Sequence, residues 1–321
     1  MNKKILIFTG DPNSINSEII YKGWKKISSV LKKKIYFISN YNLIKAQFKK
    51  LNYKANFEIV ENINKSTLNN NIKILNIDLK FKNPFKVDEK NNKKFLKKSL
   101  DYAHKLSQTK DISGFITCPI NKKLLGNEKI GLTEYLARKN KVKRHSEAMI
   151  ITNNKFSVCP ITTHIDLKDV SKKISRKSII EKIKTINAWY NKSRGKKPKI
   201  CILGLNPHNA EYRKNSEEKK IIMPVVKYLK KKAIKISGPL SADTVFIENY
   251  KKYDVVIGMY HDQVIAPFKT IFKLNAINIT LGLKYLRVSP DHGTAPNLIM
   301  KKKASEQSLI KCINFVSKFS K

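Results

Sequence analysis

The sequence predicts an α/β fold with a largely parallel sheet, and two observations support that prediction. Short apolar runs typical of buried strands alternate with longer segments whose apolar residues recur at helical spacing. The chain has 321 residues, of which 41% are hydrophobic, enough for two domains, or one large one, with a sizeable core. No apolar run approaches the roughly 20 residues that span a bilayer, so we expect no membrane partner.

The first half of the chain begins with a predicted strand at residues 4–9. A helix from Ser17 to Lys33 follows, with apolar residues at helical spacing and Ser17 as the expected N-cap. The Asn-rich stretch at 62–95 has weak periodicity, and no element is assigned to most of it. The other elements expected in this half are a strand at 34–39, a helix at 43–51, a helix at 95–106 and a strand at 112–117.

The second half continues the alternation of strands and helices. Strands at 148–152 and 157–162 are expected to pair with each other. The other expected elements are a helix at 174–190, a strand at 200–204, a helix at 217–232, strands at 254–259 and 277–280, and a closing helix at 304–319.

The formal net charge of +42 permits two interpretations. One is a nucleic-acid-binding protein with a basic surface. The other is a codon bias toward Lys, Asn and Ile, which the scattered lysine doublets and triplets favour, because they form no single face with interleaved aromatics. We therefore expect no specific nucleic-acid partner, although the charge would attract anionic substrates.

Cysteine usage and the N-terminus both favour the cytoplasm. The four cysteines are widely spaced and form no CxxC pair, so we expect buried apolar side chains in a reducing compartment. The apolar part of the N-terminus is too short for a secretory signal and is followed by Gly10-Asp11-Pro12, which is typical of a strand entering a turn.

Three of the six histidines lie in polar segments at the ends of predicted strands: His164, His208 and His261. The carboxyl ends of parallel strands lie at one edge of a sheet, where open α/β folds place their sites. Neutral imidazole binds Zn, Co, Ni or Fe, and a site with three histidines leaves positions open for a substrate. A single histidine is more often a structural group, so the prediction of a divalent-metal site depends on the three converging.

Other polar segments suggest anion binding. Arg287, in a loop rich in Gly, Thr and Ser, can pair with a phosphate or carboxylate, although an ordinary polar loop has the same composition. The turn at 10–18 lies between a strand and a helix, where an anion can bind. The sequence contains neither GxGxxG nor GxxxxGK[ST], which argues against a Rossmann or P-loop site. Asp243 is either a general base or the cap of the segment at 244–250.

Taken in order, these segments resemble one family, the 4-hydroxythreonine-4-phosphate dehydrogenases of vitamin B6 synthesis. The ordered set covers nearly the whole chain and is highly specific, although each motif alone is weak. The motifs are Thr117-Cys-Pro-Ile-Asn-Lys122, Gly131-Leu-Thr-Glu-Tyr-Leu-Ala137, Thr163-His-Ile165, Gly204-Leu-Asn-Pro-His208, Glu217-Glu218, Gly238-Pro-Leu-Ser-Ala-Asp-Thr244, Tyr260-His-Asp-Gln263, Asn278-Ile-Thr-Leu-Gly-Leu283 and Ser289-Pro-Asp-His-Gly-Thr-Ala295.

The resemblance implies two α/β/α domains flanking a cleft, as in isocitrate and isopropylmalate dehydrogenases. Residues 1–128 and 270–321 would form the first domain, and residues 129–269 the second, which carries most metal ligands. It also implies a cytoplasmic homodimer whose subunits share their active sites.

The resemblance further implies a role for each site residue. It implies that His164, His208 and His261 ligate a divalent metal such as Zn, Mg or Co, with one ligand from the partner subunit. Asp243 or Asp262 would take the hydroxyl proton or orient a ligand histidine. The implied substrate-binding residues are Thr133, Lys269, Asn278 and Arg287, and the implied contacts to NAD or NADP are His292, Gly293 and Thr294.

The implied reaction is the NAD-dependent oxidation of 4-phosphohydroxy-L-threonine to 2-amino-3-oxo-4-phosphooxybutanoate, which decarboxylates to 3-amino-2-oxopropyl phosphate. The metal would acidify the substrate hydroxyl and polarise the new ketone. This chain departs from the family pattern at Leu132, where the family has His, and at Ser14, Asn16 and 209–215, where it has glycines. These departures keep open a dehydrogenase for threonate or erythronate 4-phosphate, or a catalytically degenerate relative.

Overall fold

The structure is a computed structural model that describes residues 3–64, 69–125, 131–153, 155–247, 249–273 and 275–319. It comprises two compact units. Unit 1 is Met1–Leu132 with Lys284–Lys321, and unit 2 is Thr133–Leu283. The domain boundary predicted at 128–129 lies outside the described residues. The second boundary, where the chain goes back from unit 2 to unit 1, lies after residue 283 and not after residue 269. The strand predicted at 277–280 therefore belongs to unit 2.

The sheet of unit 1 is parallel in every described strand pair, as predicted. Its strand order is β3-β4-β2-β1-β5-β12. The bounds are β1 Lys4–Phe8, β2 Ile35–Ser39, β3 Phe57–Ile59, β4 Ile72–Asn76, β5 Ile112–Thr117 and β12 Arg287–Pro290. Because β1, β5 and β12 are parallel neighbours, the loops that follow them leave the sheet at the same edge.

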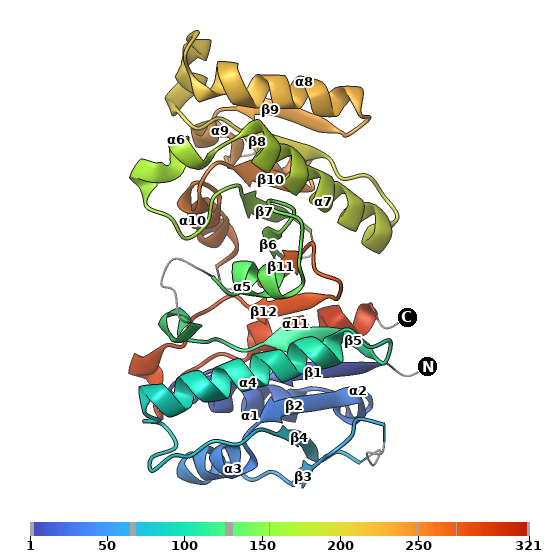
Figure 1. The fold of residues 1–321 in the computed structure, drawn as a ribbon, viewed down its shortest axis with the longest axis vertical. Helices are drawn as coiled ribbons and strands as arrows, with labels where there is room; N and C mark the ends of the chain where they lie inside the picture. Colours follow the sequence, from blue (N-terminus) through green and yellow to red (C-terminus); the bar gives the residue numbers. More distant parts are fainter. Residues whose placement is uncertain are drawn as a thin grey trace. The chain divides into compact units, whose positions relative to one another are not determined.

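Helices cover both faces of this sheet (Figure 1). Helix α4 places Phe95 against Phe8 of β1, with ring centroids 6.2 Å apart. Helix α11 packs so closely on β5 that a Cβ on Gly114 would lie 2.7 Å from Val316 Cγ1, which explains the glycine in this strand. The helices of unit 1 are α1 Asn16–Lys26, α2 Ser29–Lys34, α3 Tyr41–Lys50, α4 Glu89–Ser107 and α11 Gln307–Lys318.

Two helices of unit 1 differ from the predictions. The helix expected from Ser17 to Lys33 is two helices, because Ile27 between them is extended. Ser17 is buried inside α1 and is not its N-cap. Helix α4 starts earlier than predicted because Asp88 caps it, accepting a hydrogen bond of 2.9 Å from the backbone N–H of Asn91.

The sheet of unit 2 is mixed. Its order is β11-β6-β7-β10-β8-β9, and β6 runs antiparallel to both of its neighbours, as expected for its pairing with β7. Strands β7, β10, β8 and β9 are parallel to one another. The bounds are β6 Ala148–Thr152, β7 Ser157–Pro160, β8 Ile200–Leu203, β9 Ile236–Leu240, β10 Val255–Gly258 and β11 Ile277–Leu281.

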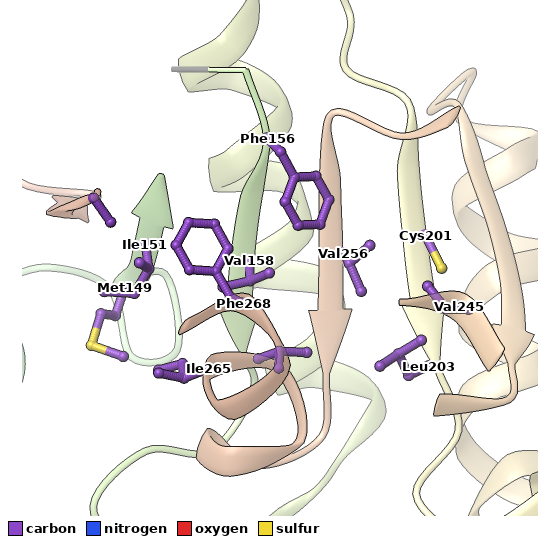
Figure 2. Close-up of a cluster of buried hydrophobic side chains, with 12 residues drawn as sticks. Met149, Ile151, Phe156, Val158, Cys201, Leu203, Val245, Val256, Ile265 and Phe268 are labelled. Atoms are coloured by element: carbon purple, nitrogen blue, oxygen red, sulfur yellow. The ribbon is translucent and has the colours of Figure 1, made fainter. Parts of the chain in front are cut away.

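The core of unit 2 holds helix α10 (His261–Phe272) against the sheet (Figure 2). Phe156 and Phe268 stack there with ring centroids 6.0 Å apart. Alternate strand residues face the other side, where the Ser157 hydroxyl lies 2.8 Å from the Tyr190 hydroxyl of α7. The fold therefore fixes α10, which begins at one predicted metal ligand, by packing along its apolar face.

The remaining helices of unit 2 differ from the predictions mainly at their ends. The segment predicted as one helix at 217–232 is a π-helical turn at Glu218–Ile222 that continues into α8. Gly238–Thr244 comprises the end of β9 and the start of α9, so Asp243 lies inside that helix and is not a cap of the segment at 244–250. The other helices are α5 Leu132–Lys139, which begins at the end of unit 1, α6 Val170–Lys173, α7 Arg176–Arg194, α8 Met223–Lys231 and α9 Ala242–Val245.

All four cysteines are buried and free, as predicted. Burial raises the pKa of the Cys159 and Cys201 thiols to about 12, so they stay protonated at neutral pH. Within the described ranges, the helices include none with the length and apolar character needed to cross a membrane.

Two helix ends predict opposite effects of glycine on stability. Ala233, exposed after α8, has φ +55°, whereas Gly195 at the end of α7 has φ +63° and open space around its Cβ position. Since left-handed backbone is strained for residues with a Cβ, Ala233→Gly should stabilise the protein by about 0.5–1 kcal/mol. Gly195→Ala, the matched control, should destabilise it by about as much. Urea denaturation midpoints would check both signs.

Candidate active site

Three neighbouring parallel strands of unit 2 each end just before a predicted metal ligand. His164 follows β7, His261 follows β10 and His208 follows β8. The sheet order β7-β10-β8 makes β10 the middle strand. The three histidine-bearing segments therefore leave the sheet at one edge.

Two of these imidazoles lie close together. The ring centroids of His164 and His261 are 6.2 Å apart, with the ring planes inclined at 43°. A metal–nitrogen bond of about 2 Å, plus about 1 Å from the nitrogen to the ring centre, puts two rings on one tetrahedral ion about 5 Å apart and at most about 6 Å apart. The two rings would therefore have to approach each other by about 1 Å to share a tetrahedral ion. Within a single chain, the described His, Cys, Asp and Glu side chains form no group of three or more that could hold an ion.

Each predicted ligand has a carboxylate facing its Nδ1 atom. His261 Nδ1 lies 2.6 Å from Asp262 Oδ1, a hydrogen-bond distance. His164 Nδ1 lies 3.8 Å from Glu134 Oε2, and His208 Nδ1 lies 3.9 Å from Asp243 Oδ2. A carboxylate that accepts a hydrogen bond from Nδ1 leaves Nε2 as the atom available to a metal. Only the His261–Asp262 pair is at hydrogen-bond distance, and the other two pairs would have to close by a small rotation of the ring.

His208 begins a strained turn. The five residues His208 to Tyr212 all have φ between 49° and 56°, in the left-handed region, and none is glycine. Such a conformation costs roughly 1–2 kcal/mol per residue, so surrounding contacts must hold it. Arg213 and Lys214 after the turn are exposed and line a hollow of ≈ 370 Å³ together with Asn206, Asn215, Ser216 and Glu217.

Glu218 holds the segment that leads into this turn. Its carboxylate is fully buried and accepts hydrogen bonds of 2.8 Å from the backbone N–H groups of Leu205 and Asn206. The Asn206 side-chain amide also donates to Glu218 and to Glu217 Oε2. Burial would raise the pKa of Glu218, but the hydrogen bonds from Asn206 and Leu205 outweigh it and hold the pKa below its ordinary value. An ionised Glu218 thus fixes the chain just before His208.

The predicted substrate residues of unit 2 lie on three elements. Thr133, buried at the start of α5, has its hydroxyl 3.1 Å from that of Thr280 on β11. Asn278 lies on the same strand, and its buried Oδ1 accepts no hydrogen bond from the described part of the chain. Lys269 is half-buried on α10. Leu132, next to Thr133, is buried and offers no polar group.

Arg287 belongs to unit 1. It is the first residue of β12 and is 3% exposed, which is unusual for a guanidinium. Its Nε donates a hydrogen bond of 3.0 Å to the Thr117 hydroxyl on β5, and its Nη2 donates to the same oxygen. The Thr117 contact orients the guanidinium at the end of the neighbouring strand.

The predicted cofactor loop also belongs to unit 1. His292, Gly293 and Thr294 follow β12, and the carbonyl oxygen of Thr294 accepts a hydrogen bond of 3.2 Å from the backbone N–H of Ile15. His292 Nδ1 lies 3.1 Å from the Gly293 carbonyl oxygen. The loop is therefore tied to the segment after β1, at the sheet edge shared by β1, β5 and β12.

The segment after β1 accommodates its missing glycines without strain. Neither Ser14 nor Asn16 has a positive φ. The Asn16 side chain donates a hydrogen bond of 2.8 Å to the carbonyl oxygen of Pro119, and the Ser14 hydroxyl bonds to the carbonyl oxygen of Asp11. Only Gly10, at φ +78°, requires glycine, because a Cβ there would lie 2.5 Å from the Pro119 carbonyl oxygen.

Three residues of these sites had no predicted role: Glu134, Thr117 and Glu218. Each lies inside a motif that the sequence analysis identified. The motifs alone did not indicate their roles, because the contacts to His164, Arg287 and Asn206 each join two different segments.

Comparisons with known proteins agree with this fold. The family described as "Pyridoxal phosphate biosynthetic protein PdxA" matches residues 31–316. The 4-hydroxythreonine-4-phosphate dehydrogenase of Sulfurihydrogenibium sp. is 37% identical over 318 residues, 97% of this chain and 96% of that protein. The D-threonate 4-phosphate dehydrogenase of Pectobacterium atrosepticum is 33% identical over 212 residues, 64% of each protein.

Solved structures give the same result. The crystal structure of 4-hydroxythreonine-4-phosphate dehydrogenase from Klebsiella pneumoniae superposes with a TM-score of 0.85 at 26% identity, covering 99% of this chain and 100% of that one. Isocitrate dehydrogenase from Methylococcus capsulatus superposes with a TM-score of 0.53 at 10% identity, covering 98% and 84%, which shows the fold alone. The predicted isocitrate dehydrogenase-like α/β fold is therefore confirmed, and the chain belongs to the PdxA family of pyridoxal phosphate biosynthetic proteins.

Proposed function

We propose that this protein is a cytoplasmic, homodimeric dehydrogenase that depends on a divalent metal and NAD or NADP. Its proposed substrate is 4-phosphohydroxy-L-threonine, oxidised to 2-amino-3-oxo-4-phosphooxybutanoate, which decarboxylates to 3-amino-2-oxopropyl phosphate. The observation that carries the proposal lies beyond the carboxyl ends of β7, β10 and β8. Three imidazoles follow these strands, and each has a carboxylate oxygen within 4 Å of its Nδ1 atom. The near full-length likeness to a 4-hydroxythreonine-4-phosphate dehydrogenase supports the choice of substrate.

The donor set fits a divalent metal of the Zn or Co type. A small movement of the neighbouring His164 and His261 rings would let them share an ion, and His208 would complete the set with one ligand drawn from a second copy of the chain. A metal bound there would lower the pKa of the substrate hydroxyl and polarise the ketone that forms. The residues themselves supply imidazole nitrogens, and Asp262 would keep His261 in the tautomer whose Nε2 can ligate.

The substrate would be held through its phosphate and its polar carbon chain. Lys269 and Arg287 supply positive charge for the phosphate, and Thr133 a hydroxyl. Asn278 has a buried amide oxygen that lacks a donor among the described residues, so a substrate amine or hydroxyl would satisfy it.

We infer that Asp243, rather than Asp262, is the base that accepts the proton of the substrate hydroxyl. Asp262 already contacts His261 at 2.6 Å, which suits an orienting role. Asp243 is 3.9 Å from His208 and more than half of its side chain is exposed, so it is free to accept a proton.

His292, Gly293 and Thr294 would hold the nicotinamide cofactor, which supplies hydride-accepting chemistry when bound. That loop is pinned to the segment after β1 through Thr294 and Ile15. A Cβ on Gly293 would meet nothing within 4 Å, so the loop backbone is open to a ligand.

Steady-state NADH formation tests the proposal. The purified protein, supplied with metal, should reduce NAD with 4-phosphohydroxy-L-threonine and should contain about one ion per chain. No turnover of that substrate with NAD or NADP would refute the assignment. Calorimetric titration with NAD would identify a degenerate relative, which should show no binding.

A second candidate, D-threonate or erythronate 4-phosphate, is favoured by Leu132. This buried alkyl group stands beside Thr133 where the family has histidine, so it can make no hydrogen bond to a substrate amine or hydroxyl. If 4-phosphohydroxythreonine is the substrate, Leu132→His should raise its kcat/KM by about tenfold, the value of one hydrogen bond near 1.4 kcal/mol. Leu132→Asn, polar but without the ring, is the control. Higher kcat/KM of the unmodified enzyme for threonate or erythronate 4-phosphate would favour the second candidate.

A further inference from the structure

We propose that Glu134 is a positioning residue, which fixes the ring of His164 in the tautomer and orientation that bind a metal. This inference rests on the proposed function, since it assigns a role at the same metal site. Glu134 lies one position after Thr133 on α5, and His164 follows β7, so two separate segments of unit 2 meet here.

The geometry of the Glu134 carboxylate supports this role. One oxygen, Oε1, accepts a hydrogen bond of 2.7 Å from the Thr163 hydroxyl, which sets the plane of the carboxylate. The other, Oε2, is buried, accepts no hydrogen bond from the described residues and lies 3.8 Å from His164 Nδ1. A buried carboxylate oxygen without a donor is costly, and a small rotation of the imidazole would supply one.

Shielding distinguishes this pair from the two other histidine–carboxylate pairs. The side chains of His164 and Glu134 are only 24% and 27% exposed. Those of His208 and Asp243 are 74% and 57% exposed, and Asp262 is 80% exposed. Water therefore competes less for the Glu134 carboxylate than for the carboxylates of Asp243 and Asp262, so a hydrogen bond formed here would be stronger than one formed at an exposed pair.

The chemistry follows from the two imidazole nitrogens. When Nδ1 carries the proton and donates it to Glu134, the lone pair stays on Nε2, which points away from the carboxylate and can ligate a metal. A glutamine at position 134 has nearly the same shape, but its NH2 group can donate to Nδ1. The proton of His164 would then move to Nε2, and the nitrogen needed for ligation would be blocked.

The test compares Glu134→Gln with the unmodified protein in metal-binding titrations with Zn²⁺ and Co²⁺. We expect affinity to fall about 10- to 100-fold, as for other carboxylates that orient a ligand histidine. Excess metal should restore most of kcat. Asp166→Asn is the matched control, because it removes the same charge two residues from His164 on an exposed side chain without a capping hydrogen bond.

A second measurement distinguishes positioning from general structural support. Nitrogen NMR of the metal-free protein should show His164 with its proton on Nδ1, and the Glu134→Gln variant with its proton on Nε2. Equal metal affinities and the same tautomer in both proteins would overturn the role of Glu134 while leaving the proposed function intact. An unmodified protein that binds neither ion would instead overturn the metal site, and this inference with it.

Discussion

Replacing His261 with alanine is expected to abolish metal retention and to lower kcat by about a thousandfold or more. Lewis-acid stabilisation by a bound ion contributes several kcal/mol to such a reaction, and each 1.36 kcal/mol is a factor of about ten. The fold should survive, because His261 is the first residue of α10, is partly exposed and is replaced by a good helix former. Metal analysis and steady-state kinetics on the same preparation would measure both effects.

The control for this variant is His104→Gln, which alters an imidazole on α4 of unit 1 that contacts the Tyr285 hydroxyl. It should retain both metal and activity. A His261→Ala protein that still holds one ion per chain and turns over at the normal rate would show that the edge of β7, β10 and β8 is not the metal site.

Replacing Glu218 with alanine is expected to cost about 3–5 kcal/mol of stability. The variant would leave the partly buried backbone N–H groups of Leu205 and Asn206 without their acceptor and would remove one of the two carboxylates that accept from the Asn206 amide, and each lost acceptor costs about 1–3 kcal/mol. The segment that leads into the left-handed turn would also lose its anchor, so metal affinity should fall as well. Urea denaturation would measure the loss as a shift in midpoint.

The pH dependence of this loss has a definite sign. The folded-state pKa of Glu218 is lowered, so its contribution is present above the ordinary glutamate pKa and is lost as the pH falls through the lowered value. The difference between the parent and the Glu218→Ala protein should therefore be constant near neutrality and shrink in acid. Glu211→Ala, an exposed change in the same turn, should have little effect. A difference that grows in acid would contradict the assignment.

Strand positions followed from the sequence where a buried strand is an uninterrupted apolar run. The strands predicted at 112–117, 200–204 and 254–259 agree with β5, β8 and β10 within a residue or two, because parallel strands covered by helices are apolar throughout. Strand β4 was missed because Lys73, which is fully buried, interrupts its apolar run. Strand β9 was missed because it contains Gly238 and Pro239, which the edge of a sheet tolerates.

The sequence predicted those features of the site that depend on neighbouring residues, but not those that depend on distant ones. Strand ends identified the three histidines as candidates, but the order β7-β10-β8, which makes them neighbours, depends on long-range pairing. The same holds for Glu134 beside His164 and for Thr117 beside Arg287, whose partners come from distant segments. The left-handed turn at His208 carries no glycine signal, so only the backbone reveals it.

The split of unit 1 between two distant stretches has a consequence for biosynthesis. Unit 2 is continuous, so its sheet can form on the ribosome as soon as residue 283 has emerged. At that stage strand β5 still has one edge unpaired, and its face around Gly114 is uncovered, because β12 and α11 are translated later. We expect nascent chains stalled before residue 284 to engage chaperones and aggregate, since an open apolar strand edge templates intermolecular pairing.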